Sequence, residues 1–203
     1  MRTLYYFFTL FLFSCTIGHS NRNQFAIYSD TTSRFGLSDH QWHQKLTESM
    51  NLSRIDNGVD SFELRLWFNA VMTDLRTVTI LKYTNSTWSL NETHYWYRLL
   101  NDWGKHSEFN IDSSVTKRLL PQLTFLQSID SIKTFRLDTI ITQYSIPNFR
   151  NNVADGIFYT IEISTKDYYR RISYSNPKYY SDPYDKQISR FLDFMNRNFK
   201  ASK

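Results

Sequence analysis

The sequence predicts an α+β domain in which an antiparallel sheet is packed by two helices, and three observations support this class. Several segments alternate apolar and polar residues with a period of two, which is typical of strands with one buried face. A middle segment and the C-terminal segment carry apolar residues at helical spacing. The composition, with 41% hydrophobic and 17% aromatic residues, provides ample material for a core.

The first predicted elements are a helix and a strand. Ser38 is positioned to cap a helix that runs to Met50, with Trp42, Leu46 and Met50 as its apolar stripe. In segment 62–68, FELRLWF, four apolar residues alternate with three others. This alternation predicts a strand that is buried on one face.

Two further strands are expected to complete an antiparallel meander. Segment 76–83, RTVTILKY, is rich in β-branched residues, and segment 87–97 resumes the pattern after the turn TNS. Short polar links between successive strands favour antiparallel neighbours. Segment 100–116 is polar and is expected to form a loop.

The middle of the chain predicts one helix followed by irregular structure. Pro121 is expected to begin the helix, because apolar residues recur at a spacing of three after it. Segment 135–146 shows no clear period, and NNVADG at 151–156 predicts a turn. The apolar positions of this helix are Leu123, Leu126, Ile129 and Ile132.

The chain is expected to end in a hairpin and a helix. Segments 157–165 and 168–174 read as strands joined at a two-residue turn. Asp182 supplies the N-cap of the final helix and Pro183 its first residue. Its apolar stripe is expected to pack on the sheet and consists of Ile188, Phe191, Leu192, Met195 and Phe199.

Residues 1–14 are predicted to be a signal peptide. Arg2 gives a positive start, and the apolar stretch 4–13 is shorter than the about 20 residues that a membrane span needs. The sequence LFSC at 12–15 resembles the lipobox of bacterial lipoproteins, and Cys15, the only cysteine, stands where that motif carries its acyl chains. We therefore predict a lipid anchor at Cys15, a tether over 15–37 and a single domain over 38–203.

Cleavage after Ser20 is the alternative interpretation of the same leader. Gly18 and Ser20 provide the small residues that a conventional signal peptidase requires. Under that interpretation Cys15 is discarded and the protein is soluble in the periplasm or secreted.

Two parts of the chain resemble small, uncharacterised bacterial envelope proteins. They are DGIFYTIEISTKDYYRRISYSNPKYYSDPYDKQISRFLDFM at 155–195 and, less closely, FELRLW with VTILKYTNSTWSL. The resemblance implies an exported protein with a strand meander, a middle helix, a final hairpin and a terminal helix. It implies no activity and no catalytic residues.

No motif in the sequence specifies catalysis, a cofactor or a metal site. GxSxG, P-loop, GxGxxG and HExxH patterns are absent. His40 and His43 are three residues apart, but no third ligand is specified, so we predict an exposed polar pair and no metal. A hydrolase acting on envelope glycan or peptide stays as an alternative, because the separation of two carboxylates is set only in three dimensions.

A run of tyrosines near two arginines is the most unusual feature. Tyrosine and arginine are enriched at binding hot spots, which predicts a binding surface for an envelope protein or a glycan. The alternative is that alternate tyrosines of the hairpin face the core. The residues of the predicted surface are Tyr169, Arg170, Arg171, Tyr179 and Tyr180.

The charge and the leader together define the predicted class of protein. The formal net charge is +5, but the basic residues are scattered, and this distribution argues against a nucleic-acid partner. The sequence therefore predicts a binding module held at the membrane of the bacterial cell envelope, without a cofactor.

Overall fold

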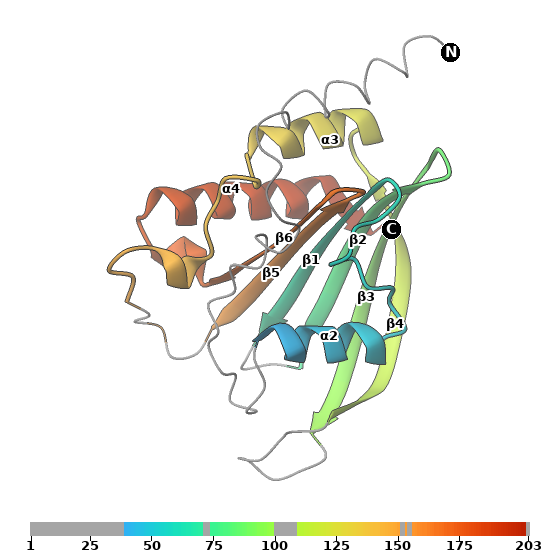
Figure 1. The fold of residues 1–203 in the computed structure, drawn as a ribbon, viewed down its shortest axis with the longest axis horizontal. Helices are drawn as coiled ribbons and strands as arrows, with labels where there is room; N and C mark the ends of the chain where they lie inside the picture. Colours follow the sequence, from blue (N-terminus) through green and yellow to red (C-terminus); the bar gives the residue numbers. More distant parts are fainter. Residues whose placement is uncertain (1–38, 71–73, 100–108, 151–152, 154–155, 202–203) are drawn as a thin grey trace.

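The protein is built around one antiparallel sheet with helices on both faces (Figure 1). A computed structural model describes residues 39–203 except 71–73, 100–108, 151–152, 154–155 and 202–203. The predicted signal peptide, Cys15 and the tether lie outside the described residues. The elements are α2 (Asp39–Ser49), β1 (Phe62–Ala70), β2 (Arg76–Thr84), β3 (Thr87–Leu99), β4 (Phe109–Pro121), α3 (Phe125–Thr134), η1 (Gln143–Ser145), β5 (Ile157–Thr165), β6 (Tyr168–Ser175), η2 (Pro177–Tyr179), α4 (Pro183–Asn198) and β7 (Phe199–Ala201).

The strand order is β6-β5-β1-β2-β3-β4-β7, and all neighbours are antiparallel. The predicted meander and the predicted hairpin belong to the same sheet because β5 pairs with β1. Leu64 of β1 lies opposite both Leu81 and Ile163, which places three apolar side chains in one row across the sheet. The predicted class, an antiparallel sheet with packed helices, is confirmed.

α4 covers one face of the sheet and carries the main core. Its N-cap is Asp182, whose carboxylate accepts a hydrogen bond from the N–H of Tyr184 at 2.8 Å. Ile188, Phe191 and Leu192 are at most 1% exposed. The helix ends at Asn198, so the last residue of the predicted stripe, Phe199, is the first residue of β7.

α3 packs on the same side as α4, and it starts later than predicted. Pro121 is the last residue of β4, and the helix begins at Phe125. The reason is local: Thr124 and Gln127 form a reciprocal capping box, which fixes the helix start at Thr124.

The loop predicted over 100–116 is wrong for its second half, which belongs to β4. The central part of this strand, Asp112–Arg118, is exposed on both faces, so it has no apolar alternation to reveal it. Its backbone pairs along β3, with Arg118 opposite Asn91. Pairing with the preceding strand β3 therefore stabilises this strand, although its own sequence shows no apolar alternation.

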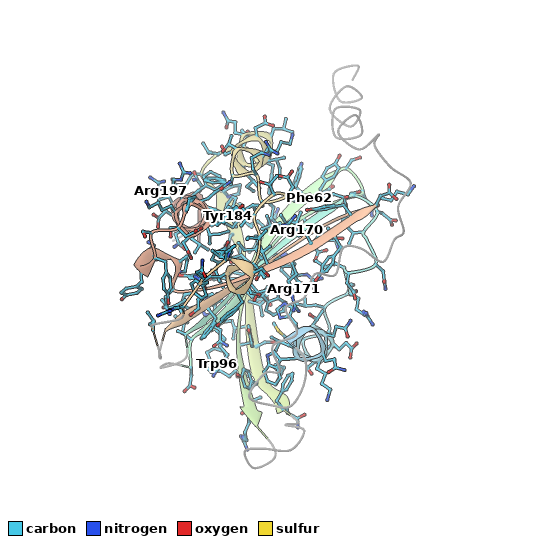
Figure 2. The ribbon with its side chains drawn as sticks, turned by 60° about the vertical axis from the view of Figure 1, so that its left-hand side comes forward. Phe62, Trp96, Arg170, Arg171, Tyr184 and Arg197 are labelled. Carbon is cyan, nitrogen blue, oxygen red and sulfur yellow. The ribbon has the colours of Figure 1, made fainter. Side chains whose placement is uncertain are left out.

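α2 covers the opposite face, and Figure 2 shows it across the sheet from α3 and α4. Trp42 and Leu46 of this helix pack in a second apolar cluster with Val78, Tyr95 and Phe109. β1 is consequently buried on both faces, contrary to the half-buried strand that was predicted. Its side chains toward α2 are at most 3% exposed: Glu63, Arg65 and Trp67.

No helix of the described residues has the length and apolar character needed to cross a membrane.

Candidate functional site

A cluster of buried polar side chains lies between α2 and the sheet, with Glu162 of β5 at its centre. Glu162 is 4% exposed. One carboxylate oxygen accepts a hydrogen bond from Trp67 Nε1 at 2.7 Å, and the other accepts one from the Tyr169 hydroxyl at 2.8 Å. His43 of α2 completes the group, with its Nε2 at 3.4 Å from Glu162 Oε2. The cluster thus joins α2 to β1, β5 and β6.

Arg65 and Glu63 extend the cluster along β1. The two side chains point to the same face because they are two residues apart, and Arg65 Nε donates to Glu63 Oε1 at 2.7 Å. Arg65 Nη2 also donates to the carbonyl of Ser53 at 2.6 Å. Lys82 of β2 lies 3.3 Å from the second oxygen of Glu63. The guanidinium therefore ties the segment after α2 to the sheet.

The charges of the cluster keep Glu162 ionised. Burial acts to raise the pKa of this carboxyl, but the nearby His43, the Arg65 guanidinium and the Trp67 hydrogen bond more than offset it and lower the pKa to about 2. A buried carboxylate with this set of donors is stable as an anion.

A small cavity adjoins the cluster. Its volume is about 20 Å³, and His43, Arg65, Glu162 and Tyr169 are among the residues that line it. That volume suits one water molecule, which needs about 10–15 Å³. Two buried nitrogens of residues that line this cavity have no hydrogen-bond partner among the described residues: Arg65 Nη1 and His43 Nε2.

The geometry of this cluster favours a structural role. Both oxygens of Glu162 are engaged, and a cavity for one water excludes a sugar or a peptide. The prediction of an exposed polar pair at His40 and His43 is wrong for His43, which is 8% exposed and packs against the Trp67 ring at 4.6 Å. His43 faces inward because α2 lies on the sheet.

A larger and more open depression lies between η2 and α4 on the other side of the molecule. It is a groove of about 710 Å³, within the range of ligand pockets. Its rigid apolar parts are Pro177, Pro183 and Tyr180, whose ring packs edge-on against Phe149 at 5.0 Å. Its other lining residues are Lys178, Lys186, Ser189, Arg190 and Asp193.

The groove has an excess of positive charge. Lys178 is paired with Asp193, with Nζ 2.6 Å from Oδ1. Within the part of the chain that the structure describes, Lys186 and Arg190 have no acidic partner. These two cations are four residues apart on α4, which disfavours the helix by about 0.2–0.5 kcal/mol. Lys186 also lies near the positive N-terminal end of the helix.

The structure divides the predicted binding residues among three places. Tyr169 is 9% exposed and bonds Glu162, and Arg171 lies on the same face of β6. Arg170 points to the opposite face, where it donates to the carbonyls of Asp138 and Ile140 (Figure 2). The remaining two belong to the groove region: Tyr180 lines the groove, and Tyr179, in η2 beside it, is 77% exposed.

The sequence contained signals for both sites that the prediction did not use. Trp67 occupies a polar phase of the β1 alternation, and a tryptophan there indicates that the second face is covered too. Lys186 and Arg190 share one exposed side of a helix that was predicted correctly. Glu162 had no local signal, because two of its partners, His43 and Trp67, are distant in sequence.

The described residues include no group of three or more His, Cys, Asp or Glu side chains that could hold a metal ion. No family model, curated protein or solved structure matches the chain.

Proposed function

We propose that this protein is an exported binding module, anchored to the bacterial membrane through Cys15, and that the groove between η2 and α4 binds a carboxylate-bearing partner chain. The groove is the observation that carries this proposal. It offers two cations, Lys186 and Arg190, that have no acidic partner among the described residues, and they lie beside rigid apolar walls. Carboxylates bind arginine and lysine through charge-assisted hydrogen bonds, and proline walls lose little entropy on binding.

The proposed anchor and the proposed groove belong to different parts of the sequence. The predicted tether precedes Asp39, whereas the groove is formed by segments near the C-terminus. The leader with LFSC at 12–15 supports the anchor, and cleavage after Ser20 would leave the same groove on a soluble protein. The intact mass of the protein from its native host distinguishes the anchored form from the soluble form. We expect a chain that starts at Cys15 and carries acyl groups, and we expect the acyl groups to be absent from Cys15→Ser. An unmodified chain starting at Asn21 contradicts the anchor.

A hydrolase finds less support in the described residues. Among the described residues, convergent ionisable groups gather around Glu162. The cavity beside them has a volume of about 20 Å³, whereas ligand pockets have volumes of about 300–1,000 Å³. The serine of the open groove, Ser189, has no adjacent general base, since its hydroxyl has no hydrogen-bond partner among the described residues.

Binding of a labelled polyglutamate peptide tests the groove directly. Fluorescence anisotropy is measured at low salt for the wild-type protein and for Lys186→Glu/Arg190→Glu. We expect the double variant to weaken binding about tenfold or more, equivalent to about 1.4 kcal/mol. Binding by the wild type is also expected to fall as salt is added.

The matched control reverses two charges on the other side of the sheet. Lys45 on α2 and Lys166 in the β5–β6 turn are both exposed. Lys45→Glu/Lys166→Glu changes the net charge by the same amount and is expected to leave most of the affinity intact. Equal losses in both double variants would show attraction by overall charge alone, and the groove would be rejected.

A further inference from the structure

The two edges of the sheet differ in how the backbone N–H and C=O groups that point away from the sheet find hydrogen-bond partners. Along β6, two side chains replace a neighbouring strand. The Thr142 hydroxyl donates to the carbonyl of Ser173 at 3.0 Å and accepts from its N–H at 3.1 Å. The Gln143 amide donates to the carbonyl of Ser175 at 3.0 Å and accepts from its N–H at 2.7 Å. The Ser173–Ser175 part of this edge is therefore closed to another strand.

The edge formed by β4 is covered only at one end. β7 pairs with Leu119–Pro121 and stops there. At the other end the β3–β4 register shifts between Trp96 and Tyr97, which leaves Asp112 as a bulge. Between these limits no described segment pairs with the outer side of Asp112–Arg118, and its side chains are exposed on both faces.

The hydrogen-bonding groups of this open stretch can be assigned by alternation. The N–H of Gln122 points outward, because it donates to the carbonyl of Asn198 at 2.8 Å. In a regular strand every second residue directs its N–H and C=O to the same side. The outward groups of the open stretch therefore belong to Ser114, Thr116 and Arg118.

We propose that two copies of this chain pair through Asp112–Arg118 of β4, antiparallel and about a two-fold axis at Val115. This register uses the whole open stretch, since Val115 is its middle residue. It places the outward groups of Ser114 opposite those of Thr116 in the second copy. It also places Asp112 opposite Arg118 of the second copy, so that opposite charges meet at both ends of the interface.

Neighbouring registers fit less well. An axis at Lys117 would put this lysine opposite its own copy and would bring the strand of the second copy into the place of β7. The partly covered β6 edge favours pairing that stops at two copies. Among the described strands the open stretch of β4 is the edge available in each copy, and the dimer pairs these two stretches with each other.

Cysteine cross-linking tests this register in the full chain. At a non-hydrogen-bonded antiparallel pair the two Cα atoms are about 4.5 Å apart, within the range that a disulfide spans. Val115→Cys is therefore expected to give a disulfide-linked dimer on a non-reducing gel under mild oxidation. Val115 is 59% exposed, so this change should leave the fold intact.

Leu120→Cys is the matched control. Leu120 lies on the same strand and is 58% exposed, but β7 occupies the backbone beside it. We expect about tenfold more cross-linked dimer with Val115→Cys than with Leu120→Cys. In the proposed dimer the two thiols of Val115→Cys are held next to each other, whereas the thiols of Leu120→Cys meet only by random collision. Adding Arg118→Glu to Val115→Cys is expected to lower the yield. The wild-type chain is oxidised in parallel. Because its only cysteine is Cys15, any dimer that it forms measures cross-linking through Cys15.

A monomeric Val115→Cys protein, or equal yields for Val115→Cys and Leu120→Cys, would overturn the proposal. The first result is expected if a segment of the same chain, or another protein, occupies the edge. Light scattering of the wild-type protein in detergent adds a measurement without cysteines. It gives a two-copy mass if the proposal holds and a one-copy mass if it fails.

Discussion

Replacing Glu162 with glutamine should change how the stability of the protein depends on pH. Glu162 lies beneath α2 and is ionised in the folded state, with its pKa lowered from 4.5 to about 2. Glu162→Gln keeps the shape of the side chain and removes the charge. The charge is held by His43 and by Arg65, and the Trp67 N–H donates to it at 2.7 Å.

The size of the effect follows from proton linkage. A carboxyl with a depressed folded-state pKa adds stability that is complete above its unfolded pKa and is lost as the pH falls through its folded pKa. A fall from 4.5 to about 2 corresponds to about 3 kcal/mol, at about 1.4 kcal/mol for each pKa unit. The wild type should therefore be more stable than Glu162→Gln by about 3 kcal/mol above pH 5, and the gap should nearly close near pH 2.

Urea unfolding followed by tryptophan fluorescence measures this gap at several pH values. Other carboxyls, including Asp185, whose pKa burial raises, are present in both proteins, so their contributions cancel. Glu48→Gln, at an exposed position of α2, controls for the loss of one negative charge. A gap that stays constant from pH 6 to about pH 2 would refute the reasoning, because no proton uptake would then be linked to Glu162.

Three further substitutions test the fold by thermal or urea unfolding. Gly58→Ala should cost more than about 1 kcal/mol, because Gly58 has φ +91° and an added Cβ would lie 2.5 Å from the carbonyl oxygen of Lys166; a neutral result would contradict that geometry. Gln143→Ala should cost about 2–4 kcal/mol, since it leaves the buried Asp185 carboxyl and the backbone of Ser175 without their partner; a loss below about 1 kcal/mol would mean that water replaces the amide. Asp182→Ala should cost about 1 kcal/mol through the lost N-cap of α4, whereas Asp182→Asn should recover most of it.

The parts of the fold that could be predicted are those encoded by neighbouring residues. α4 has its cap, its first-position proline and its apolar stripe within a short segment, and β1 shows its period directly. β4 could not be predicted, because its central part is exposed on both faces and owes its conformation to β3. The pairing of β5 with β1 could not be predicted either. These strands are far apart in the sequence, and a long-range pairing produces no pattern in the residues of either strand.

The same distinction applies to the candidate sites. Tyrosine and arginine content drew attention to 169–180, but strand alternation sends Arg170 and Arg171 to opposite faces. Only Tyr179 and Tyr180 of the predicted surface lie at the groove. The cations of the groove, Lys186 and Arg190, could have been found from their spacing, whereas the wall opposite them depends on how η2 folds against α4.

Amide chemical-shift mapping by NMR is the most direct test of the binding groove. Unlabelled polyglutamate peptide is titrated into isotope-labelled protein, and the shifts of backbone amides are followed. The account predicts that the largest changes fall on residues 178–193, around η2 and the first two-thirds of α4, and that Lys186→Glu/Arg190→Glu abolishes them. Changes centred on α2 or spread evenly over the basic residues would contradict the groove as the binding site.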